Sequence, residues 1–492
     1  MTRPIVVVGA GMASARLVEG LVARGLGDRV TMLGEERQPP YNRILLSAVL
    51  EGSHRPGALA LRSQEWYADH GVDLRLGTRV VDIHRDRPEG RRTVELADRQ
   101  ELPYEQVVLA TGSIPTLPPI RGLVQVDGRL HPKVHAFRSL EDCARLLDAL
   151  PTARSAAIVG GGLLGLQVAR ALSVRGLRTE VVEGGDHLLR SQVDETAGQV
   201  LARSLRRCGT EIYLGARAVR LTTAGLRLDN GYTLDTDLVI LCAGGRPHAN
   251  LARRAGLTVR RGVLVDDRLC SVDDDRVYAV GDCAEACSDA YGGQPHGFVP
   301  PAWEQAGVLA ARLAGEDARY GGHRLVARLR ATDLEVAVLG DPRHEPGEIV
   351  EVSNPIAGTH RRLVMRAGRI VAGTLVGDLS RIGTITQHFD KGTVLGVREA
   401  GALLLPDPAP EGTPGGMADL PDDAEVCACA GVSAGRIRAC VSLAEVREIT
   451  RATTGCGGCS STVRSVLEAG AAVGVRLAGE RREAVRKTSP SR

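Results

Sequence analysis

Four cysteines in the C-terminal part of this 492-residue sequence have the side-chain type and spacing of a metal site. Cys427 and Cys429 form the first pair, and Cys456 and Cys459 form the second pair after twenty-six intervening residues. Four thiolates can hold either a structural zinc ion or a two-iron cluster. The sequence therefore predicts a metal site with these four ligands, and the cysteines by themselves leave both metals open.

A glycine-rich segment near the N-terminus predicts a dinucleotide-binding site. An apolar run ends in a GxGxxG-like motif formed by Gly9, Gly11 and Ser14, in which serine replaces the third glycine. The first glycine makes the tight turn, and the second lets the backbone approach a pyrophosphate at the N-terminus of the following helix. Glu35, which follows the next apolar run, is placed to accept hydrogen bonds from ribose hydroxyls.

A second copy of the motif is complete. Its glycines are Gly160, Gly162 and Gly165, and Glu183 lies at the tip of the strand that we expect to follow. A carboxylate at this place binds the ribose 2′-hydroxyl and repels a 2′-phosphate. Although Arg190 lies further along the same segment, Glu183 predicts NADH in preference to NADPH.

The elements that must position these motifs are two βαβ units. In each unit a buried strand leads into the glycine turn, a helix follows, and a second strand ends near the acidic residue. The expected strands are residues 4–8 and 29–33 in the first unit and 156–159 and 178–183 in the second. Further apolar runs that end in glycine turns lie at 106–112, 238–245 and 276–282.

The pattern changes in the last third of the chain. Short alternating segments between residues 325 and 403 predict an antiparallel sheet. The segment 406–424, with its Pro, Gly and Asp residues, is typical of a linker. The arginine-rich end, 476–492, predicts a solvated, disordered tail.

Composition excludes some classes of protein. A hydrophobic fraction of 43% and a charged fraction of 25% are ordinary for a soluble globular protein. The net charge of +3 is spread along the chain, so nothing favours nucleic acid or a membrane surface as a partner. The sequence has neither a secretory signal nor an apolar run that could span a bilayer, and we expect a cytoplasmic protein.

Two motifs other than the GxGxxG-like motifs resemble a known family. Ala110-Thr111-Gly112 and Val280-Gly281-Asp282 are similar to the motifs that flank the FAD site in flavoprotein reductases with two dinucleotide-binding domains. The resemblance implies that the first glycine motif holds FAD and that the second lies in an inserted NAD domain. It also implies that Asp282 binds the ribityl–phosphate region of the flavin. The segment 244–247 resembles the family's return strand, which implies that Gly245 lies near the nicotinamide cofactor.

The resemblance implies an α/β fold class with several domains. Two Rossmann-like domains, with the NAD domain inserted in the FAD domain, are followed by an α+β interface domain and a small helical [2Fe–2S] domain. The expected limits are 1–115 and 236–318 for the FAD domain, 116–235 for the NAD domain, 319–404 for the interface-like antiparallel β domain, 405–424 for the linker, 425–475 for the [2Fe–2S] domain and 476–492 for the basic tail.

Many relatives reduce disulfides with a pair of redox cysteines beside the flavin, but this sequence does not support that reaction. No cysteine precedes Cys143, and Cys283 and Cys287 are too widely spaced for a CxxC pair. We predict that Cys283 and Cys287 are small packing residues.

A more specific resemblance lies in the same N-terminal region. Pro40-Tyr41-Asn42-Arg43, and later Gly281-Asp282-Cys283-Ala284-Glu285 and Trp303-Glu304-Gln305-Ala306, are similar to the flavoprotein region of the large subunit of NADH-dependent assimilatory nitrite reductases. Tyr291-Gly292 belongs to the same likeness. The resemblance implies that Arg43 lies near the flavin.

The cysteine segment resembles the bacterioferritin-associated ferredoxin-like [2Fe–2S] domain. The likeness includes Gly431-Val432 after the first pair and Gly455-Cys456-Gly457 at the second. Behind a flavin domain, this likeness favours an iron–sulfur cluster over zinc. Cys440 lies between the pairs in a segment that we expect to be helical, and we predict that it packs in the core.

These resemblances together imply an oxidoreductase that passes electrons from NADH through FAD to the [2Fe–2S] cluster and on to a partner. Because the cofactors carry the hydride and the electrons, we expect no catalytic acid–base residue. No cysteine group follows Cys459, so we expect an electron-transfer subunit that resembles the one of assimilatory nitrate reductase and donates to a separate catalytic chain.

Three alternatives remain open. The chain could be the flavoprotein part of a split nitrite reductase, which differs only in the partner that accepts the electrons. It could be the flavin subunit of an opine- or amine-type dehydrogenase, against which the complete second motif with Glu183 argues. It could also be an NADH oxidase whose last domain is a zinc-stabilised docking module.

Overall fold

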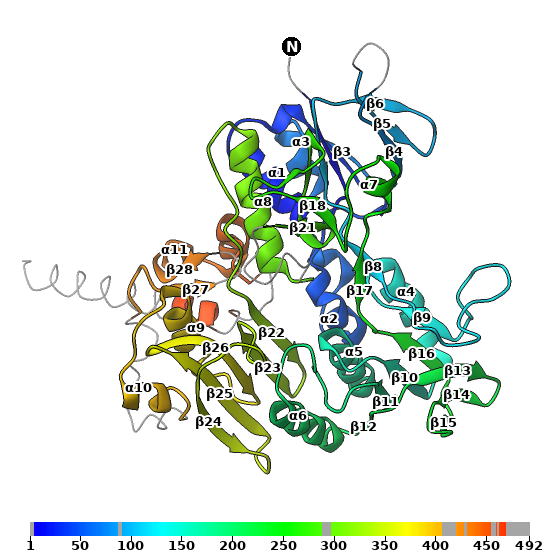
Figure 1. The fold of residues 1–492 in the computed structure, drawn as a ribbon, viewed down its shortest axis with the longest axis vertical. Coiled ribbons are helices and arrows are strands. Elements are labelled where there is room, and N and C mark those ends of the chain that lie inside the picture. Colours follow the sequence, from blue (N-terminus) through cyan, green and yellow to red (C-terminus); the bar gives the residue numbers. More distant parts are fainter. Residues whose placement is uncertain are drawn as a thin grey trace, which may run out of the picture. The chain divides into compact units, whose positions relative to one another are not determined.

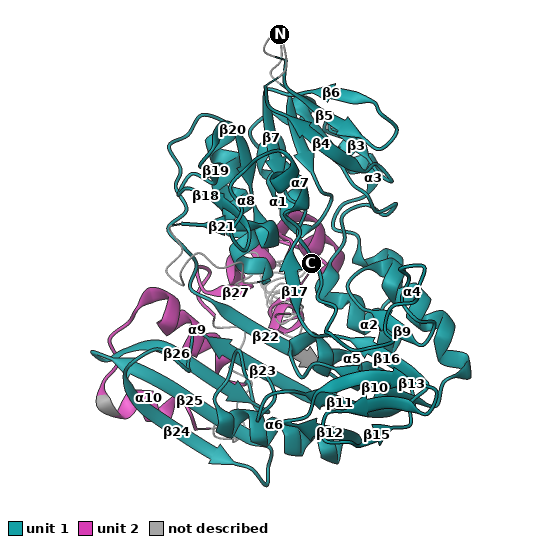
Figure 2. Cartoon of the chain, turned by 45° about the vertical axis from the view of Figure 1, so that its right-hand side comes forward, with its two compact units in different colours: residues 1–379 teal, residues 380–492 magenta. Residues whose placement is uncertain are grey.

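The computed structural model of the chain describes residues 4–86, 91–287, 297–405, 420–427, 431–453, 459 and 462–468. The chain divides into two compact units, Met1–Leu379 and Ser380–Arg492, which Figure 2 shows in teal and magenta. The boundary between the two units lies inside the segment 319–404, which the sequence predicts to be one domain. The domain limits expected from the sequence therefore stay a prediction. In the described part of the chain, no helix combines the length and the apolar character that crossing a membrane requires.

The first unit begins with an eight-stranded sheet around the first glycine motif (Figure 1). Its four central strands run parallel, and every residue of β1 is buried, as expected for a strand that is covered on both faces. In spatial order these strands are β20 (Asp274–Ala279), β7 (Gln106–Leu109), β1 (Ile5–Val8) and β2 (Val30–Leu33). The outer strands are β3 (Asp73–Arg75) on one side and β19 (Cys270–Ser271), β18 (Val263–Val265) and β21 (Ala284–Ala286) on the other.

Helices α1 (Met12–Val22) and α8 (Val299–Leu313) pack closely beside this sheet. A Cβ atom at Gly20 of α1 would lie only 2.6 Å from the Cβ atom of Ala310 in α8. Glycine at this position therefore allows the two helix backbones to approach each other.

The second sheet is parallel throughout and surrounds the second glycine motif. Its strands are, in order, β12 (Thr210–Leu214), β11 (Arg178–Glu183), β10 (Ser155–Val159), β16 (Leu238–Leu241) and β9 (Val134–Ala136). Its helices are α4 (Leu140–Ala149), α5 (Leu163–Val174) and α6 (Glu195–Arg207). Since residues 263–286 return to the first sheet, the second sheet is an insertion in the first, which confirms the predicted arrangement of two Rossmann-like folds.

Two short strands connect the sheets. β8 (Ser113–Pro115) leaves the first sheet, β17 (Gly245–Pro247) returns to it, and the two pair antiparallel. The smaller elements of this part are the sheets β4 (Val80–His84), β5 (Thr93–Leu96) and β6 (Glu101–Pro103), and β13 (Ala218–Thr222), β14 (Gly225–Leu228) and β15 (Thr233–Leu234), with helices α2 (Leu46–Glu51), α3 (Gln64–Asp69) and α7 (Asn250–Arg254).

The predicted antiparallel sheet is present at the end of the first unit. Its strands are, in order, β22 (Val326–Ala331), β23 (Leu334–Leu339), β26 (Arg369–Val376), β25 (Thr359–Arg366) and β24 (Glu348–Asn354). All neighbouring pairs are antiparallel, as the alternating sequence pattern indicates.

The second unit contains short elements. They are α9 (Ile382–Lys391), α10 (Val397–Ala402), β27 (Glu425–Cys427), β28 (Val432–Ser433), α11 (Ala434–Arg438), α12 (Leu443–Glu445) and a single π-turn over Val446–Thr450. The prediction that Cys440 lies within a helix is wrong, because α11 ends before it and Ser442 begins α12 by accepting a hydrogen bond from the Glu445 N–H at 3.2 Å.

Where α6 packs against β25, a half-buried carboxylate, that of Asp194, has a strongly shifted pKa. Asp194 caps α6 by accepting a hydrogen bond from the Ala197 N–H at 3.1 Å, and its Oδ2 lies 3.7 Å from Nε2 of the buried His360 and 3.6 Å from Nη1 of Arg362. Burial acts to raise the pKa of Asp194, but His360, the Ala197 N–H and Arg362 outweigh it and lower the pKa to about 2.

This shift predicts acid-dependent stability. The pKa of Asp194 is lower in the folded chain than in the unfolded chain. The ionised carboxylate therefore stabilises the fold above the unfolded pKa, and this stabilisation is lost as the pH falls through about 2. We expect Asp194→Asn to lower the free energy of unfolding at neutral pH by about 2 kcal/mol and to have a much smaller effect near pH 2. Urea unfolding of both proteins across this pH range measures the difference, and an equal loss at every pH would contradict the assignment.

Candidate functional site

The first glycine motif forms a cradle that only glycine can build. Gly9 has a φ of +113°, and a Cβ atom there would lie 2.3 Å from the Ala110 carbonyl oxygen. A Cβ atom at Gly11 would meet none of the described atoms within 4 Å, so this backbone is open at the N-terminus of α1. A tight turn followed by an open helix N-terminus fits the pyrophosphate of a dinucleotide.

The serine that departs from the motif is accommodated without strain. Ser14 is fully buried, and its hydroxyl accepts a hydrogen bond from the Gly11 N–H at 3.4 Å. In the second motif, a Cβ atom at Gly165 would lie 2.0 Å from the Gly160 carbonyl oxygen. The third position therefore has to be glycine in the second motif but not in the first.

Four predicted segments meet at one edge of the first sheet. Gly9, Glu35, Thr111-Gly112 and Gly281-Asp282 follow β1, β2, β7 and β20, which are parallel neighbours, so their carboxyl ends share an edge. The Thr111 hydroxyl donates a hydrogen bond to the His248 carbonyl oxygen at 2.6 Å. The Glu35 side chain is 63% exposed, and its Oε1 lies 3.8 Å from Nε of Arg79. Its carboxylate is therefore accessible to a ligand.

Helix α8 fixes two of these loops. The Gln305 side-chain oxygen accepts a hydrogen bond from the Gly281 N–H at 2.8 Å, and the Trp303 indole N–H donates to the Met12 carbonyl oxygen at 3.2 Å. These two side chains belong to the motif Trp303-Glu304-Gln305-Ala306, whose sequence alone indicates only a family likeness. The structure gives them a role in positioning the first glycine motif and the Gly-Asp motif.

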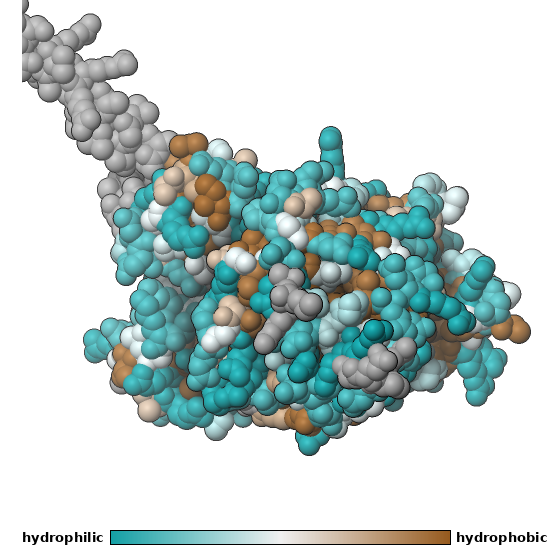
Figure 3. Space-filling view, turned by 90° about the horizontal axis from the view of Figure 1, so that it is seen from above, coloured by the Kyte–Doolittle hydropathy of each residue, from teal (hydrophilic) through white to brown (hydrophobic). Residues whose placement is uncertain are grey.

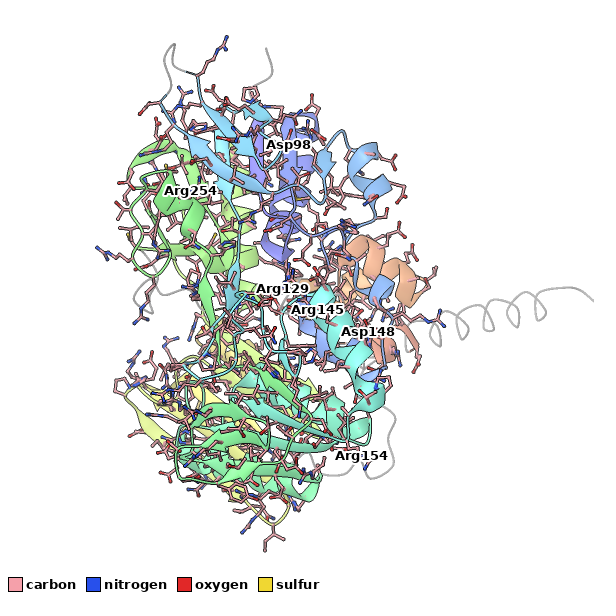
Figure 4. The ribbon with its side chains drawn as sticks, turned by 90° about the vertical axis from the view of Figure 1, so that its right-hand side faces the viewer. Asp98, Arg129, Arg145, Asp148, Arg154 and Arg254 are labelled. Carbon is pink, nitrogen blue, oxygen red and sulfur yellow. The ribbon has the colours of Figure 1, made fainter. Side chains whose placement is uncertain are left out.

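Asp282 has partners that the sequence analysis missed. Its Oδ2 accepts hydrogen bonds from the Ser113 hydroxyl at 2.7 Å and from Nη2 of Arg138 at 2.8 Å. Arg138 in turn precedes α4, where the Asp142 carboxylate accepts hydrogen bonds from the backbone N–H groups of Arg138 and Ser139 at 3.1 and 2.9 Å. Figure 4 labels Arg145 and Asp148 on the same helix. In the sequence, the Ser139–Asp142 capping box indicates where α4 begins, but nothing indicates that Arg138 meets Asp282.

Arg43 reaches the same cluster. It forms an ion pair with Glu36 and donates hydrogen bonds to the Tyr41 hydroxyl at 3.0 Å and to the Arg138 carbonyl oxygen at 3.2 Å. Burial acts to lower the pKa of Arg43, but Tyr41, Glu36 and Asp282 outweigh it and raise the pKa. Arg43 and Asp282 are thus close enough for their charges to interact.

The second glycine motif repeats the geometry of the first. Gly160 has a φ of +115°, and a Cβ atom there would lie 2.4 Å from the Cys242 carbonyl oxygen. Among the described atoms, none lies within 4 Å of a Cβ atom at Gly162, so the N-terminus of α5 is open. Glu183 ends the neighbouring strand β11, and its Oε2 accepts a hydrogen bond from the Gly161 N–H at 2.8 Å.

Gly245 lies on β17, where the chain returns from the second sheet to the first. A Cβ atom at Gly245 would lie 3.4 Å from the Ile114 carbonyl oxygen, 3.5 Å from the Ser113 hydroxyl and 3.7 Å from Nη1 of Arg138. It therefore adjoins the cluster around Asp282, which fits a position where a nicotinamide would meet a flavin.

The cysteine segment places two of its predicted ligands in one core. Cys427 is 1% exposed and Cys459 is 5% exposed, and both belong to a hydrophobic cluster that also contains Cys440. Cys429 and Cys456 lie outside the described residues, as does Tyr291-Gly292, and among the described residues no group of three metal-ligating side chains is present. Two buried thiols in a water-excluded core fit a thiolate-ligated metal cluster.

The remaining cysteines agree in part with their predicted packing role. Cys283 is fully buried, and its thiol donates to the Leu109 carbonyl oxygen at 3.3 Å. Burial raises the pKa of Cys143 to about 11, so this thiol is a poor nucleophile. The prediction is wrong for Cys287, which is exposed because β21 ends before it.

Comparison with known proteins agrees with this geometry. A pyridine nucleotide-disulphide oxidoreductase model matches residues 3–306, and a BFD-like [2Fe-2S] binding domain model matches residues 425–469. The structure is similar to the putidaredoxin reductase–putidaredoxin complex, with a TM-score of 0.74 and 25% identity over 81% of this chain and 95% of that chain.

Two curated relatives from Bacillus subtilis match nearly the whole chain. A nitrite reductase [NAD(P)H] is 32% identical over 95% of this chain and 57% of its own length. An assimilatory nitrate reductase electron transfer subunit is 29% identical over 94% of this chain and 59% of its own length. The chain thus spans less than two thirds of the length of these relatives.

The matched family accounts for both glycine motifs, since its members bind FAD and NAD(P)H, and the second model accounts for the cysteine segment. The chain belongs to the pyridine nucleotide-disulphide oxidoreductase family and is a flavoprotein oxidoreductase with a [2Fe–2S] binding domain.

Proposed function

We propose that this flavoprotein passes electrons from NADH, by way of FAD and the [2Fe–2S] cluster, to a catalytic subunit of assimilatory nitrate reductase. One observation carries the proposal: two dinucleotide-type glycine motifs precede a [2Fe–2S] binding domain in a single chain. The similarity to an assimilatory nitrate reductase electron transfer subunit over 94% of this chain supports the choice of partner.

The residues of the chain bind and orient; none is needed as an acid or a base. When bound, FAD would supply hydride chemistry with NADH, and the cluster would supply one-electron transfer. Gly9, Gly11 and Ser14 would hold the pyrophosphate of FAD at the N-terminus of α1, and Glu35 would hold its ribose.

The remaining ligands divide between the two other groups. Arg43, Thr111, Gly112, Gly281 and Asp282 would complete the FAD site; Gly160, Gly162, Gly165, Glu183 and Gly245 would form the NAD site; and Cys427, Cys429, Cys456 and Cys459 would hold the cluster. The Arg138 guanidinium, 2.8 Å from Asp282, neutralises that carboxylate and would keep it in one orientation toward the flavin chain.

A second candidate is the flavoprotein part of a nitrite reductase. A nitrite reductase [NAD(P)H] matches 95% of this chain, and this match favours the second candidate. The matched part includes both glycine motifs and the cysteine segment. The two candidates share every residue role given above and differ only in the electron acceptor.

Anaerobic titration of the full chain with NADH tests the proposal. We expect the visible flavin bands to bleach and a reduced [2Fe–2S] signal to follow in low-temperature electron paramagnetic resonance spectra. Zinc on metal analysis, with bleaching but no paramagnetic signal, would overturn the proposed electron path. Incubation with catalytic nitrate or nitrite reductase subunits then distinguishes the candidates, because NADH would drive reduction of one anion and not the other.

A further inference from the structure

Helix α2 packs on the second sheet, although in the sequence it lies between strands of the first sheet. Its buried residues Leu46, Val49 and Leu50 belong to the same hydrophobic cluster as Leu166 and Leu172 of α5. The central strands of the first sheet belong to a different cluster. Helix α2 therefore connects the first sheet to the inserted one by packing against α5.

Both of these helices begin at a residue that we predict to bind a cofactor. Arg43 opens the short turn that leads into α2, and Gly162 is the residue from which α5 starts. The first is a predicted FAD ligand and the second is a predicted NAD ligand. The position of α2 along α5 therefore affects how the two predicted sites are placed relative to each other.

One arginine joins the two helices at their C-terminal ends. Arg175 directly follows α5, and its Nε donates a hydrogen bond to the Leu50 carbonyl oxygen in the last turn of α2. A cation is favourable there because the last carbonyl groups of a helix carry partial negative charge. A Cβ atom at Gly52 would lie 3.1 Å from Nη2 of Arg175, so glycine at this position leaves room for the guanidinium.

The N-terminal end of the same segment is attached to the inserted sheet as well. The Tyr41 hydroxyl accepts a hydrogen bond from the Leu140 N–H of α4 at 3.0 Å, and Arg43 donates to the Arg138 carbonyl oxygen at 3.2 Å. The segment 41–52 is thus held against the insert at both ends.

Helix α5 is itself held by the antiparallel sheet. Arg170 of α5 is 5% exposed, and its Nε donates to the carbonyl oxygen of Thr332, in the turn between β22 and β23, at 2.9 Å. Helix α5 is therefore a fixed support, and the contact of Arg175 with Leu50 determines where the end of α2 lies on it.

The rate of hydride transfer depends steeply on the placement of the two reacting rings, and a misplacement of about 1 Å can slow a reaction roughly a hundredfold. We propose that Arg175 is a positioning residue for hydride transfer from NADH to FAD, because it fixes the end of α2 on α5. In this step a C–H bond of the nicotinamide breaks, and the hydrogen moves with both bonding electrons to the flavin. NADH is thereby oxidised to NAD⁺, and FAD is reduced by two electrons.

This inference rests on the proposed function, because it concerns the step between the two nucleotides. Anaerobic stopped-flow mixing of the full, FAD-containing chain with saturating NADH measures the rate of flavin bleaching. We expect Arg175→Gln to lower this rate about tenfold or more. The dissociation constant of NAD⁺, measured by calorimetry, is expected to change less than about threefold, because Arg175 lies at the opposite end of α5 from Gly162.

Two further variants give the comparison its controls. Arg175→Lys is expected to keep the rate within about threefold of the wild type, because a lysine ammonium can also donate to the last carbonyl groups of α2. Arg178→Gln is the matched control. Nη2 of this exposed arginine likewise donates to a backbone carbonyl oxygen, that of Asp235 at 2.6 Å, but both residues belong to the inserted sheet. It is expected to leave the rate unchanged.

Two results would overturn the inference. One is a bleaching rate of Arg175→Gln within about twofold of the wild type. The other is a loss of FAD content or of NAD⁺ affinity in proportion to the loss of rate, which would make Arg175 a purely structural residue. Failure of NADH to bleach the flavin of the wild-type protein would instead overturn the proposed function, so the two failures are distinguishable.

Discussion

Gly9→Ala is expected to yield a protein whose FAD content is reduced roughly tenfold or more. A Cβ atom at this position would lie 2.3 Å from the Ala110 carbonyl oxygen, so either the turn after β1 or the loop after β7 has to move. The φ of +113° adds backbone strain of about 1–3 kcal/mol. Both effects act on the two loops that would hold the flavin. The ratio of flavin to protein absorbance after purification measures the loss.

Two control variants separate the clash from other effects. Gly25→Ala also places alanine at a positive φ, +72°, but a Cβ atom there would meet none of the described atoms within 4 Å. It should therefore retain FAD. Gly160→Ala repeats the clash in the second motif, where the Cys242 carbonyl oxygen is 2.4 Å away, and should retain FAD but bind nucleotide weakly. Normal flavin content in Gly9→Ala would show that the first motif is not the FAD site.

Cys459→Ser is expected to remove the iron–sulfur cluster while leaving the flavin reducible by NADH. A serine hydroxyl does not ionise as a thiol does, and position 459 lies in an apolar core where water cannot replace the lost ligand. Iron and sulfide analysis together with the paramagnetic signal measures cluster content. Retention of FAD at the wild-type level shows that the rest of the chain is folded.

Cys440→Ser is the matched control for this variant. Cys440 lies in the same core, and its thiol donates to the Arg436 carbonyl oxygen at 3.5 Å, a contact that serine can keep. The cluster should therefore survive in Cys440→Ser. Loss of the cluster from this variant, with retention in Cys459→Ser, would exchange the roles of the two cysteines.

Local sequence patterns were sufficient to predict the framework of the fold. β1 and β10 are apolar and fully buried strands that lead directly into glycine turns, so both the strand and the turn were visible in a few consecutive residues. The alternating pattern between residues 325 and 403 likewise corresponds to an antiparallel sheet that includes β23 and β26. The face in Figure 3 is mainly hydrophilic, with hydrophobic residues in smaller groups, as the charged fraction of 25% suggests.

Contacts between distant segments could not be predicted in this way. Arg138 and Asp282 are separated by 144 positions and meet only because the second sheet is inserted in the first. The ion pair of Arg190 with Glu183 depends on the path of the chain after β11, which glycine spacing does not determine. The helix predicted around Cys440 failed for a local reason, because Ser442 caps a new helix two residues later.

The pairing of β8 with β17 has a consequence for engineering and evolution. Ser113–Pro115 and Gly245–Pro247 are hydrogen-bonded neighbours, so the chain leaves and re-enters the first sheet at almost the same point. For the first sheet, everything between them is equivalent to the loop of a hairpin, and loop-closure entropy grows only slowly with length. The nucleotide-binding insert could therefore be shortened to a turn or exchanged for a foreign domain whose ends are equally close. The first sheet would keep its strand order in such a chimera.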